Sequence, residues 1–384
     1  WDRLREEIFA RQKRLGVVPA DAELTPRPAI LPAWDSLSAD QKRLYARQME
    51  VYAAFLEQTD HEVGRLLATL RQGPNADNTL VLYIVGDNGA SAEGGLNGSD
   101  DYLQDIFFRL ENGVPRQLRN LDKLGGPELE NLYAAPWAWA MDTPFQWTKQ
   151  VASHFGGTRD PLIVSWPARI KEKGGLRDQF THVNDIAPTI YELLGIRFPK
   201  EVDGVKQEPI DGSSFAASFS DARAASLHRV QYFEQLGNRA IYKDGWIAAA
   251  FHSAPTPLGR AVVGDNQAPL DFDQDQWELY HIEKDFSEAH DLAQKYPQKV
   301  NELKKLFDAE ARKNDVYPMP DSGSTFYGIV RNNRPSQISN IKEFYYAGTT
   351  PRISRTAIPK LMDSHRISAS LEVPAGGASG LIVS

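Results

Sequence analysis

The clearest hydrophobic pattern in the chain is an unbroken apolar run that stops at a polar turn. Residues 80–85 read Leu-Val-Leu-Tyr-Ile-Val, and residues 86–89 read Gly-Asp-Asn-Gly. A short continuous apolar run bounded by turn residues is typical of a strand that is buried on both faces, as in a parallel sheet. The pattern predicts a central parallel strand with Asp87 and Asn88 just beyond its carboxyl end, where open α/β sheets build their ligand sites.

Helical periodicity is strongest just before this run. Ser38 and Gln41 have the spacing of a capping box, which predicts a long helix that begins there and ends near Gly73. Apolar residues along this helix recur at a 3.6-residue period and predict a buried stripe. They are Tyr52, Phe55, Leu56, Val63, Leu66, Leu67 and Leu70. Residues 2–15 and 298–313 show helical spacing as well.

The patterns predict an α/β fold with a mixed, mostly parallel sheet between helices, in residues 1–225. A second buried strand is predicted at residues 162–166. Short apolar segments around Phe233, Tyr242 and Trp246 predict a smaller α+β subdomain with an antiparallel sheet in residues 226–330.

The last segment, residues 331–384, is predicted to wrap around the protein and then to begin a β-rich extension. Residues 331–366 carry seven Lys and Arg against two Asp and Glu. Such a stretch is either a solvated segment or a cover for an anionic substrate or partner chain. Beyond it, the alternation of Ile367, Ala369 and Leu371 is typical of a strand.

Composition excludes several classes of protein. The 384 residues are 41% hydrophobic and 24% charged, with a formal net charge of −8, which argues against a nucleic-acid partner. No apolar run reaches the ~18 residues of a membrane span. The chain has no cysteine, so it holds neither a disulfide nor a thiolate zinc site.

Two groups of residues are candidates for chemistry. Asp87 and Asn88 offer a carboxylate and a carboxamide, which suit a hard divalent cation, although the same residues also favour simple turns. Asp60, His61 and Glu62 lie in mid-helix, where a solvated face is the more frequent role for such residues.

Aromatic residues crowd the segment before Lys149. Trp137, Trp139, Phe145 and Trp147 either line the mouth of a site, where they would hold an apolar substrate, or pack their loop against the core.

Several segments, in this order along the chain, resemble motifs of the sulfatase family in the alkaline phosphatase superfamily. They are residues 86–89, Lys149 with residues 153–161 (Ser-His-Phe-Gly-Gly-Thr-Arg-Asp-Pro), residues 182–189 (His-Val-Asn-Asp-Ile-Ala-Pro-Thr), the turns 203–204 and 211–212, and residues 277–280 with 291–293.

The resemblance implies a sulfuric ester hydrolase of the arylsulfatase type, which uses a metal ion to hydrolyse a small-molecule sulfate ester. It implies that Asp87 and Asn88 bind Ca²⁺ and that Lys149 contacts the sulfate and the leaving oxygen. His154 is assigned to the same site as a catalytic residue, although a histidine at this point is also often structural. Arg159 is expected to tie down its loop by pairing with a carboxylate. A direct contact with the sulfate anion is the less frequent alternative for such a residue.

The family nucleophile is a formylglycine, made from a Cys or Ser in a Cys/Ser-x-Pro-x-Arg motif that this sequence does not contain. We therefore expect the chain to be the second part of a longer enzyme and to be inactive by itself. Two alternatives stay open: a phosphomonoester, phosphodiester or phosphonate hydrolase of the same superfamily, and an inactive binding module. The presence of Asp87, Asn88 and Lys149 argues against the module.

Overall fold

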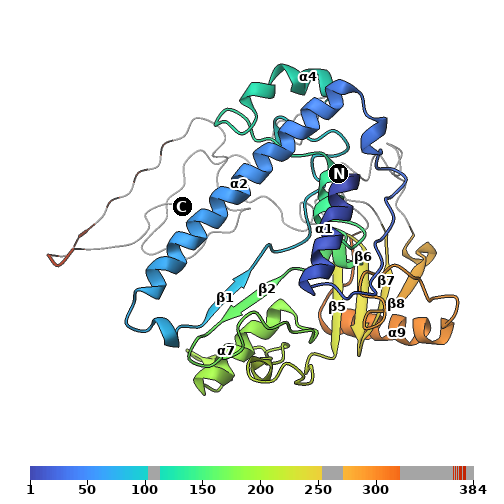
Figure 1. Ribbon diagram of the computed structural model, residues 1–384. Helices are drawn as coiled ribbons and strands as arrows, with labels where there is room; N and C mark the ends of the chain where they lie inside the picture. The colour runs from blue at the N-terminus through green and yellow to red at the C-terminus, as the bar shows by residue number, and fades with distance from the viewer. Residues whose placement is uncertain are drawn as a thin grey trace. The chain divides into compact units, whose positions relative to one another are not determined.

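The computed structural model of the protein describes residues 1–102, 113–252 and 271–320, together with residues 366, 368, 370, 372–373 and 375–377. The chain divides into two compact units, Trp1–Gly323 and Ser324–Ser384. All helices and strands named below belong to the first unit (Figure 1). The predicted basic segment lies outside the described residues, apart from Arg366, and so does most of the predicted β-rich extension.

The amino-terminal part of this unit is helical. Its helices are α1 (Asp2–Leu15), α2 (Ala39–Arg71), α4 (Val114–Arg119) and α5 (Ala135–Met141), and two of them, α1 and α2, were predicted. The capping box that starts α2 is confirmed, because Ser38 Oγ accepts a hydrogen bond from Gln41 N at 3.2 Å and Gln41 accepts one from Ser38 N at 2.9 Å. No helix in the described ranges has both the length and the apolar character needed to cross a membrane.

A buried arginine fastens α1 to the segment that leads to Lys149. The Arg5 guanidinium donates to the carbonyl oxygens of Pro144 at 3.0 Å and Phe145 at 2.8 Å, and to Thr25 Oγ1 at 2.7 Å. Burial lowers the pKa of Arg5 to about 9, so the group stays protonated near neutral pH. These bonds satisfy carbonyl groups that burial would otherwise leave without donors.

The stripe predicted on α2 is not buried. None of its seven residues is buried, and Phe55 and Leu66 are 66% and 61% exposed. The apolar residues of α2 that are buried, Leu44 and Tyr45, lie before the stripe and pack in a cluster with Trp1 and Trp137. The prediction of a buried stripe was therefore wrong. Periodicity identifies an apolar face but does not show whether anything covers it.

The strand after α2 also differs from its prediction. Strand β1 (Val81–Ile84) pairs antiparallel with β2 (Leu162–Ser165), so the prediction of a buried parallel strand was wrong. Ile84 is 39% exposed and Ile163 is 54% exposed. An apolar run indicates a strand but carries no direct information about the direction of its neighbour. Within the described residues, every strand pair is antiparallel.

A four-stranded antiparallel sheet follows, in the order β5-β6-β7-β8. Its strands are β5 (Val230–Gln235), β6 (Asn238–Lys243), β7 (Trp246–Ala250) and β8 (Trp277–His281). Helix α9 (Pro297–Lys313) packs against it through Val300, Leu303 and Phe307. Figure 1 shows this sheet as separate from β1 and β2. The strands predicted around Phe233, Tyr242 and Trp246 are thus present, while the boundary predicted at residue 226 stays a prediction.

Short elements connect these parts. They are α6 (Phe155–Thr158), α7 (Ile186–Leu194), β3 (Glu201–Val202), β4 (Val205–Lys206) and the 3₁₀ turns Trp34–Ser36, Ala76–Asn78, Leu121–Lys123, Val183–Asp185, Ala216–Phe219 and Phe272–Gln274.

Candidate functional site

The polar turn after β1 forms a loop, residues 86–90, which we call the Asp-Asn loop. Val85 N donates to the carbonyl oxygen of Pro161 at 3.0 Å. Pro161 directly precedes β2, so the pairing of β1 with β2 continues up to this loop. Asp87 is exposed and Asn88 is half-buried. Both residues lie just beyond the carboxyl end of a strand, although that strand is half-exposed and antiparallel to its neighbour.

The Asp-Asn loop packs backbone to backbone against α6. Gly89 N donates to the carbonyl oxygen of Gly157 at 3.2 Å. A Cβ atom on Gly89 would lie 1.7 Å from the carbonyl oxygen of Gly156, and one on Gly156 would lie 2.0 Å from the carbonyl oxygen of Gln146. Only residues without side chains allow this approach, which explains the Gly-Gly pair in the motif at residues 153–161.

Lys149 lies beside the same loop. Its backbone N–H donates to the carbonyl oxygen of Ala90 at 3.1 Å, and its ammonium lies 2.9 Å from Glu93 Oε2. Trp147 and Gln150, on either side of it, have φ angles of 67° and 74°. Such left-handed conformations are unfavourable for residues with side chains and often mark functional sites. The structure therefore brings together Lys149 and the loop that carries Asp87 and Asn88.

Two further carboxyl groups border the loop. Asp142 Oδ1 accepts a hydrogen bond from Ala90 N at 2.8 Å, and burial raises the pKa of Asp142 well above its ordinary value. Asp160 Oδ1 lies 3.0 Å from the position that a Cβ on Gly86 would take. Burial and then the charge of Asp87 raise the pKa of Asp160 to about 6. The loop therefore lies in an acidic environment.

His154 is buried inside the protein and is not open to a substrate. Its ring is fully buried and is hydrogen-bonded through both nitrogens, Nδ1 to Ser153 Oγ at 2.8 Å and Nε2 to Glu278 Oε2 at 2.8 Å. Burial raises the pKa of Glu278, but the hydrogen bond and charge of His154 outweigh this effect and lower it. This geometry supports the structural alternative and not the catalytic assignment: His154 links α6 to β8, and neither of its ring nitrogens is free for a substrate.

Among the described residues, Arg159 makes no direct ion pair with a carboxylate; burial lowers the pKa of Arg159 to about 10, and the nearby charge of Glu288 acts in the opposite direction. The guanidinium instead lies over the rings of Phe286 at 4.1 Å, Phe155 at 5.1 Å and Phe145 at 5.4 Å. Cation–π contacts with aromatic rings take the place of an ion pair here. Arg159 thus ties down its loop, which was the first of its two predicted roles, but it does so through aromatic rings and not through a carboxylate.

The crowded aromatic residues divide between the two predicted roles. Trp137, Trp139 and Phe145 are buried and pack against the core. Trp147 is half-exposed and stacks on Phe251, with their ring centroids 4.2 Å apart. Only Trp147 remains a candidate for substrate contact.

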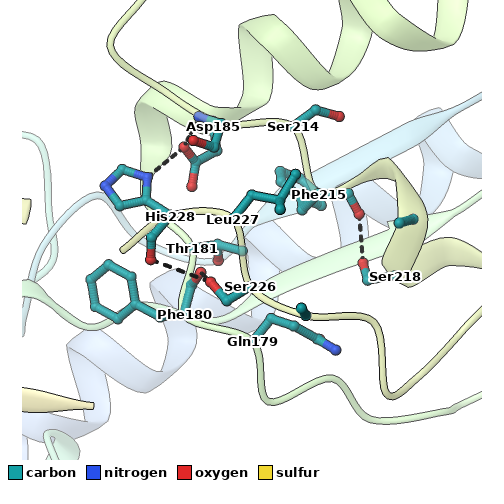
Figure 2. A pocket seen from close by; sticks show the side chains of 13 residues that line it. Gln179, Phe180, Thr181, Asp185, Ser214, Phe215, Ser218, Ser226, Leu227 and His228 are labelled. Carbon is teal, nitrogen blue, oxygen red and sulfur yellow. Dashed lines mark hydrogen bonds and ion pairs between the residues drawn. The ribbon is translucent and has the colours of Figure 1, made fainter. Parts of the chain in front are cut away.

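A small pocket lies beside Asp185, which belongs to the motif at residues 182–189 (Figure 2). Asp185 accepts hydrogen bonds from His228 Nδ1 at 2.6 Å, Ser213 N at 2.6 Å and His182 N at 2.7 Å. Because these donors occupy both of its oxygens, Asp185 is a structural hub that joins α7 to the chain around Ser213. His182 caps the turn before α7.

The donors around the Asp-Asn loop fit a hard cation. Carboxylate and carboxamide oxygens are the ligands that Ca²⁺ takes in proteins. Nowhere in the described ranges does a group of three or more His, Cys, Asp and Glu residues gather in a way that could hold a metal. Asp60, His61 and Glu62 are exposed, and Glu62 pairs with Arg65 at 2.6 Å, which agrees with the solvated face expected there.

Sequence reasoning did not identify Glu93, Asp142 or Asp160. Two of these residues had a usable signal, because Glu93 closely follows the Asp-Asn loop and Asp160 lies inside the Gly-Gly motif. Asp142 had none, since only the folded chain brings it to Ala90.

Comparison with known proteins relates the chain to one family. Residues 12–196 match the family model described as Sulfatase. An uncharacterized sulfatase of Schizosaccharomyces pombe is 29% identical over 326 residues, which are 83% of this chain and 53% of that protein. An arylsulfatase of Klebsiella aerogenes is 29% identical over 210 residues, which are 54% of this chain and 42% of that protein.

Solved structures give a weaker likeness. One whose description concerns metabolism of multiple glycosaminoglycans by Bacteroides thetaiotaomicron is 19% identical, with a TM-score of 0.42, over 66% of this chain and 42% of that one. The chain spans about half the length of the curated relatives that it matches.

Proposed function

This chain belongs to the sulfatase family, and on that premise we propose that it supplies part of the active site of a sulfuric ester hydrolase of the arylsulfatase type. An α/β fold of the alkaline phosphatase kind is consistent with this membership. The observation that carries the proposal is the hydrogen bond of 3.1 Å from Lys149 N to the carbonyl oxygen of Ala90. It joins the lysine to the loop of Asp87 and Asn88.

In the proposed site, the side chains of Asp87 and Asn88 hold a divalent cation, for which we propose Ca²⁺. A bound cation supplies positive charge to the sulfuryl oxygens and acts as a Lewis acid. The loop itself is held by Gly157 and by Asp142, which accept hydrogen bonds from Gly89 N and Ala90 N. This support fixes the ligands without using their side-chain oxygens.

Lys149 acts on the other side of the ester in this proposal. Its ammonium carries three N–H donors and binds the sulfate and the leaving oxygen through charge-assisted hydrogen bonds. Negative charge grows on the leaving oxygen as its bond to sulfur breaks, so a fixed ammonium stabilises the transition state more than the ground state. We assign no nucleophile to this chain.

The family match favours a sulfate ester over a phosphate ester in this proposal. A sulfate monoester carries one negative charge, whereas a phosphate monoester carries close to two near neutral pH.

A comparison of matched aryl esters tests the proposal. The protein made from its complete coding sequence would be assayed with 4-nitrophenyl sulfate and 4-nitrophenyl phosphate, before and after chelation of metal. We expect kcat/KM to be at least about tenfold higher for the sulfate, to disappear with EDTA and to return with Ca²⁺. Faster turnover of the phosphate would indicate a phosphatase. Binding of 4-nitrophenyl sulfate without turnover would indicate a binding module.

A further inference from the structure

Glu93 gathers the polar side chains around Lys149. Its Oε2 accepts hydrogen bonds from Lys149 Nζ at 2.9 Å and Ser91 Oγ at 2.9 Å. Its Oε1 accepts from Gln150 Nε2 at 2.9 Å and Tyr102 OH at 3.3 Å. The side chain of Glu93 is only 18% exposed. A carboxylate that accepts this many donors away from bulk water is firmly fixed.

The same carboxylate supports an unfavourable backbone. Gln150 has a φ angle of 74°, in the left-handed region. A non-glycine residue keeps such a conformation only where its surroundings impose it. The hydrogen bond from the Gln150 side chain to Glu93 is one such constraint, and the bond from Lys149 N to Ala90 is another. The turn that presents Lys149 is therefore held from both its backbone and its side chains.

We propose that Glu93 is a positioning residue that fixes the Lys149 ammonium beside the Asp-Asn loop; this inference rests on the proposed function of that site. A lysine side chain has a long flexible stem, so without a partner its ammonium samples many positions. Effective catalysis needs the donor in place before the substrate arrives.

The pairing leaves Lys149 able to act. Glu93 takes one of its three N–H donors, so two remain for an anionic substrate. The Lys149 side chain is 34% exposed, which leaves the ammonium open on one side. Glu93 is thus a holder of the lysine and not a group that blocks it.

Chemical labelling of amines tests the holding directly and needs no catalysis. A paired, partly buried ammonium reacts slowly with an acylating reagent, and the rate at each lysine is read by mass spectrometry. In Glu93→Gln we expect Lys149 to react at least about threefold faster than in the parent protein, because Gln offers no charge to hold the ammonium. The matched control is Glu128→Gln, since Glu128 pairs with Lys123 at 2.7 Å on the surface, where their side chains are 64% and 56% exposed. An exposed ion pair is weak, so Lys123 should react at nearly the same rate in Glu128→Gln as in the parent protein.

The turnover of 4-nitrophenyl sulfate by the protein from its complete coding sequence provides the second readout. We expect Glu93→Gln to lower kcat at least about tenfold, with KM changed less than about threefold, because positioning acts on the transition state. The variant Glu93→Asp, which retains the charge, should recover part of kcat. If thermal unfolding shows that Glu93→Gln does not fold, Glu93→Asp is measured in its place, and a smaller change in the same direction is expected, because its shorter side chain draws the carboxylate away from Lys149.

The outcomes separate this inference from the function on which it rests. An unchanged labelling rate of Lys149 overturns the inference, and so does an unchanged kcat in an active enzyme. Faster labelling with lower kcat supports it. If the parent protein turns over no sulfate ester but labelling of Lys149 still rises in Glu93→Gln, the holding of Lys149 stands and only the proposed function fails.

Discussion

Gly89 donates its backbone N–H to the carbonyl oxygen of Gly157 at 3.2 Å, and a Cβ atom on Gly89 would lie 1.7 Å from the carbonyl oxygen of Gly156. Two motifs that lie far apart in the sequence thus touch through glycine backbones. Because the contact lies next to Asp87, Asn88 and Lys149, the geometry of the whole candidate site depends on it.

The variant Gly89→Ala tests this contact. We expect it to lower the free energy of unfolding by about 2 kcal/mol or more, because the new methyl group overlaps a backbone carbonyl that cannot rotate away. The matched control is Gly64→Ala in the middle of α2, where a Cβ would meet nothing within 4 Å. That change should stabilise the protein by ~0.5–1 kcal/mol. Urea unfolding of the two variants measures both effects, and equal stabilities would contradict the described packing.

A second pair of variants tests which part of α2 is buried. Leu44 is fully buried and Leu66 is 61% exposed. Leu44→Ala should lower the free energy of unfolding by ~2–5 kcal/mol, because it leaves a cavity in the core. Leu66→Ala should change it by no more than ~0.5 kcal/mol. If thermal or urea unfolding gave a large loss for Leu66→Ala, the second half of α2 would be covered in solution.

The sequence predicted elements whose signals are local. The capping box of Ser38 and Gln41 requires only neighbouring residues, and the structure contains it. The prediction for residues 80–85 failed in direction and in burial, because these properties depend on a partner strand far along the chain. A hydrophobic pattern describes one side of a contact, and the other side is set by the fold.

In the candidate site, too, local motifs were predictable and long-range contacts were not. Asp87, Asn88 and Lys149 were found through motifs, and the structure places Lys149 beside the Asp-Asn loop. His154 was assigned from its place in a motif, yet its ring turns toward Glu278, a distant residue that sequence spacing does not reveal. Spacing along the chain brings a residue near a site but does not fix the direction of its side chain.

The buried carboxyl of Glu288 predicts a specific pH dependence of stability. Glu288 accepts a hydrogen bond from Phe155 N at 2.8 Å, and burial raises its pKa from 4.5 to about 7. The folded protein therefore binds more protons than the unfolded chain between these values. The free energy of unfolding accordingly falls as pH rises from 4.5 to about 7.

The variant Glu288→Gln should remove this contribution, because an amide does not titrate in this range. Relative to the parent protein, its free energy of unfolding should rise by up to ~3 kcal/mol between pH 4.5 and pH 7. Urea unfolding at several pH values within that window measures the difference. A difference that does not change with pH would show that Glu288 has the same pKa in the folded and unfolded proteins.

One comparison of turnover tests most directly whether the Asp-Asn loop holds the cation of a sulfate ester hydrolase. The protein made from its complete coding sequence would be assayed with 4-nitrophenyl sulfate and Ca²⁺ as Asp87→Ala and as Asp60→Ala. Each change removes one exposed carboxylate, but Asp60 lies on α2 rather than in the loop. We predict that Asp87→Ala lowers kcat/KM by ~10³-fold or more, because a charged cation ligand is lost, while Asp60→Ala stays within about twofold of the parent. Equal losses in the two variants, with unchanged melting temperatures, would contradict the account.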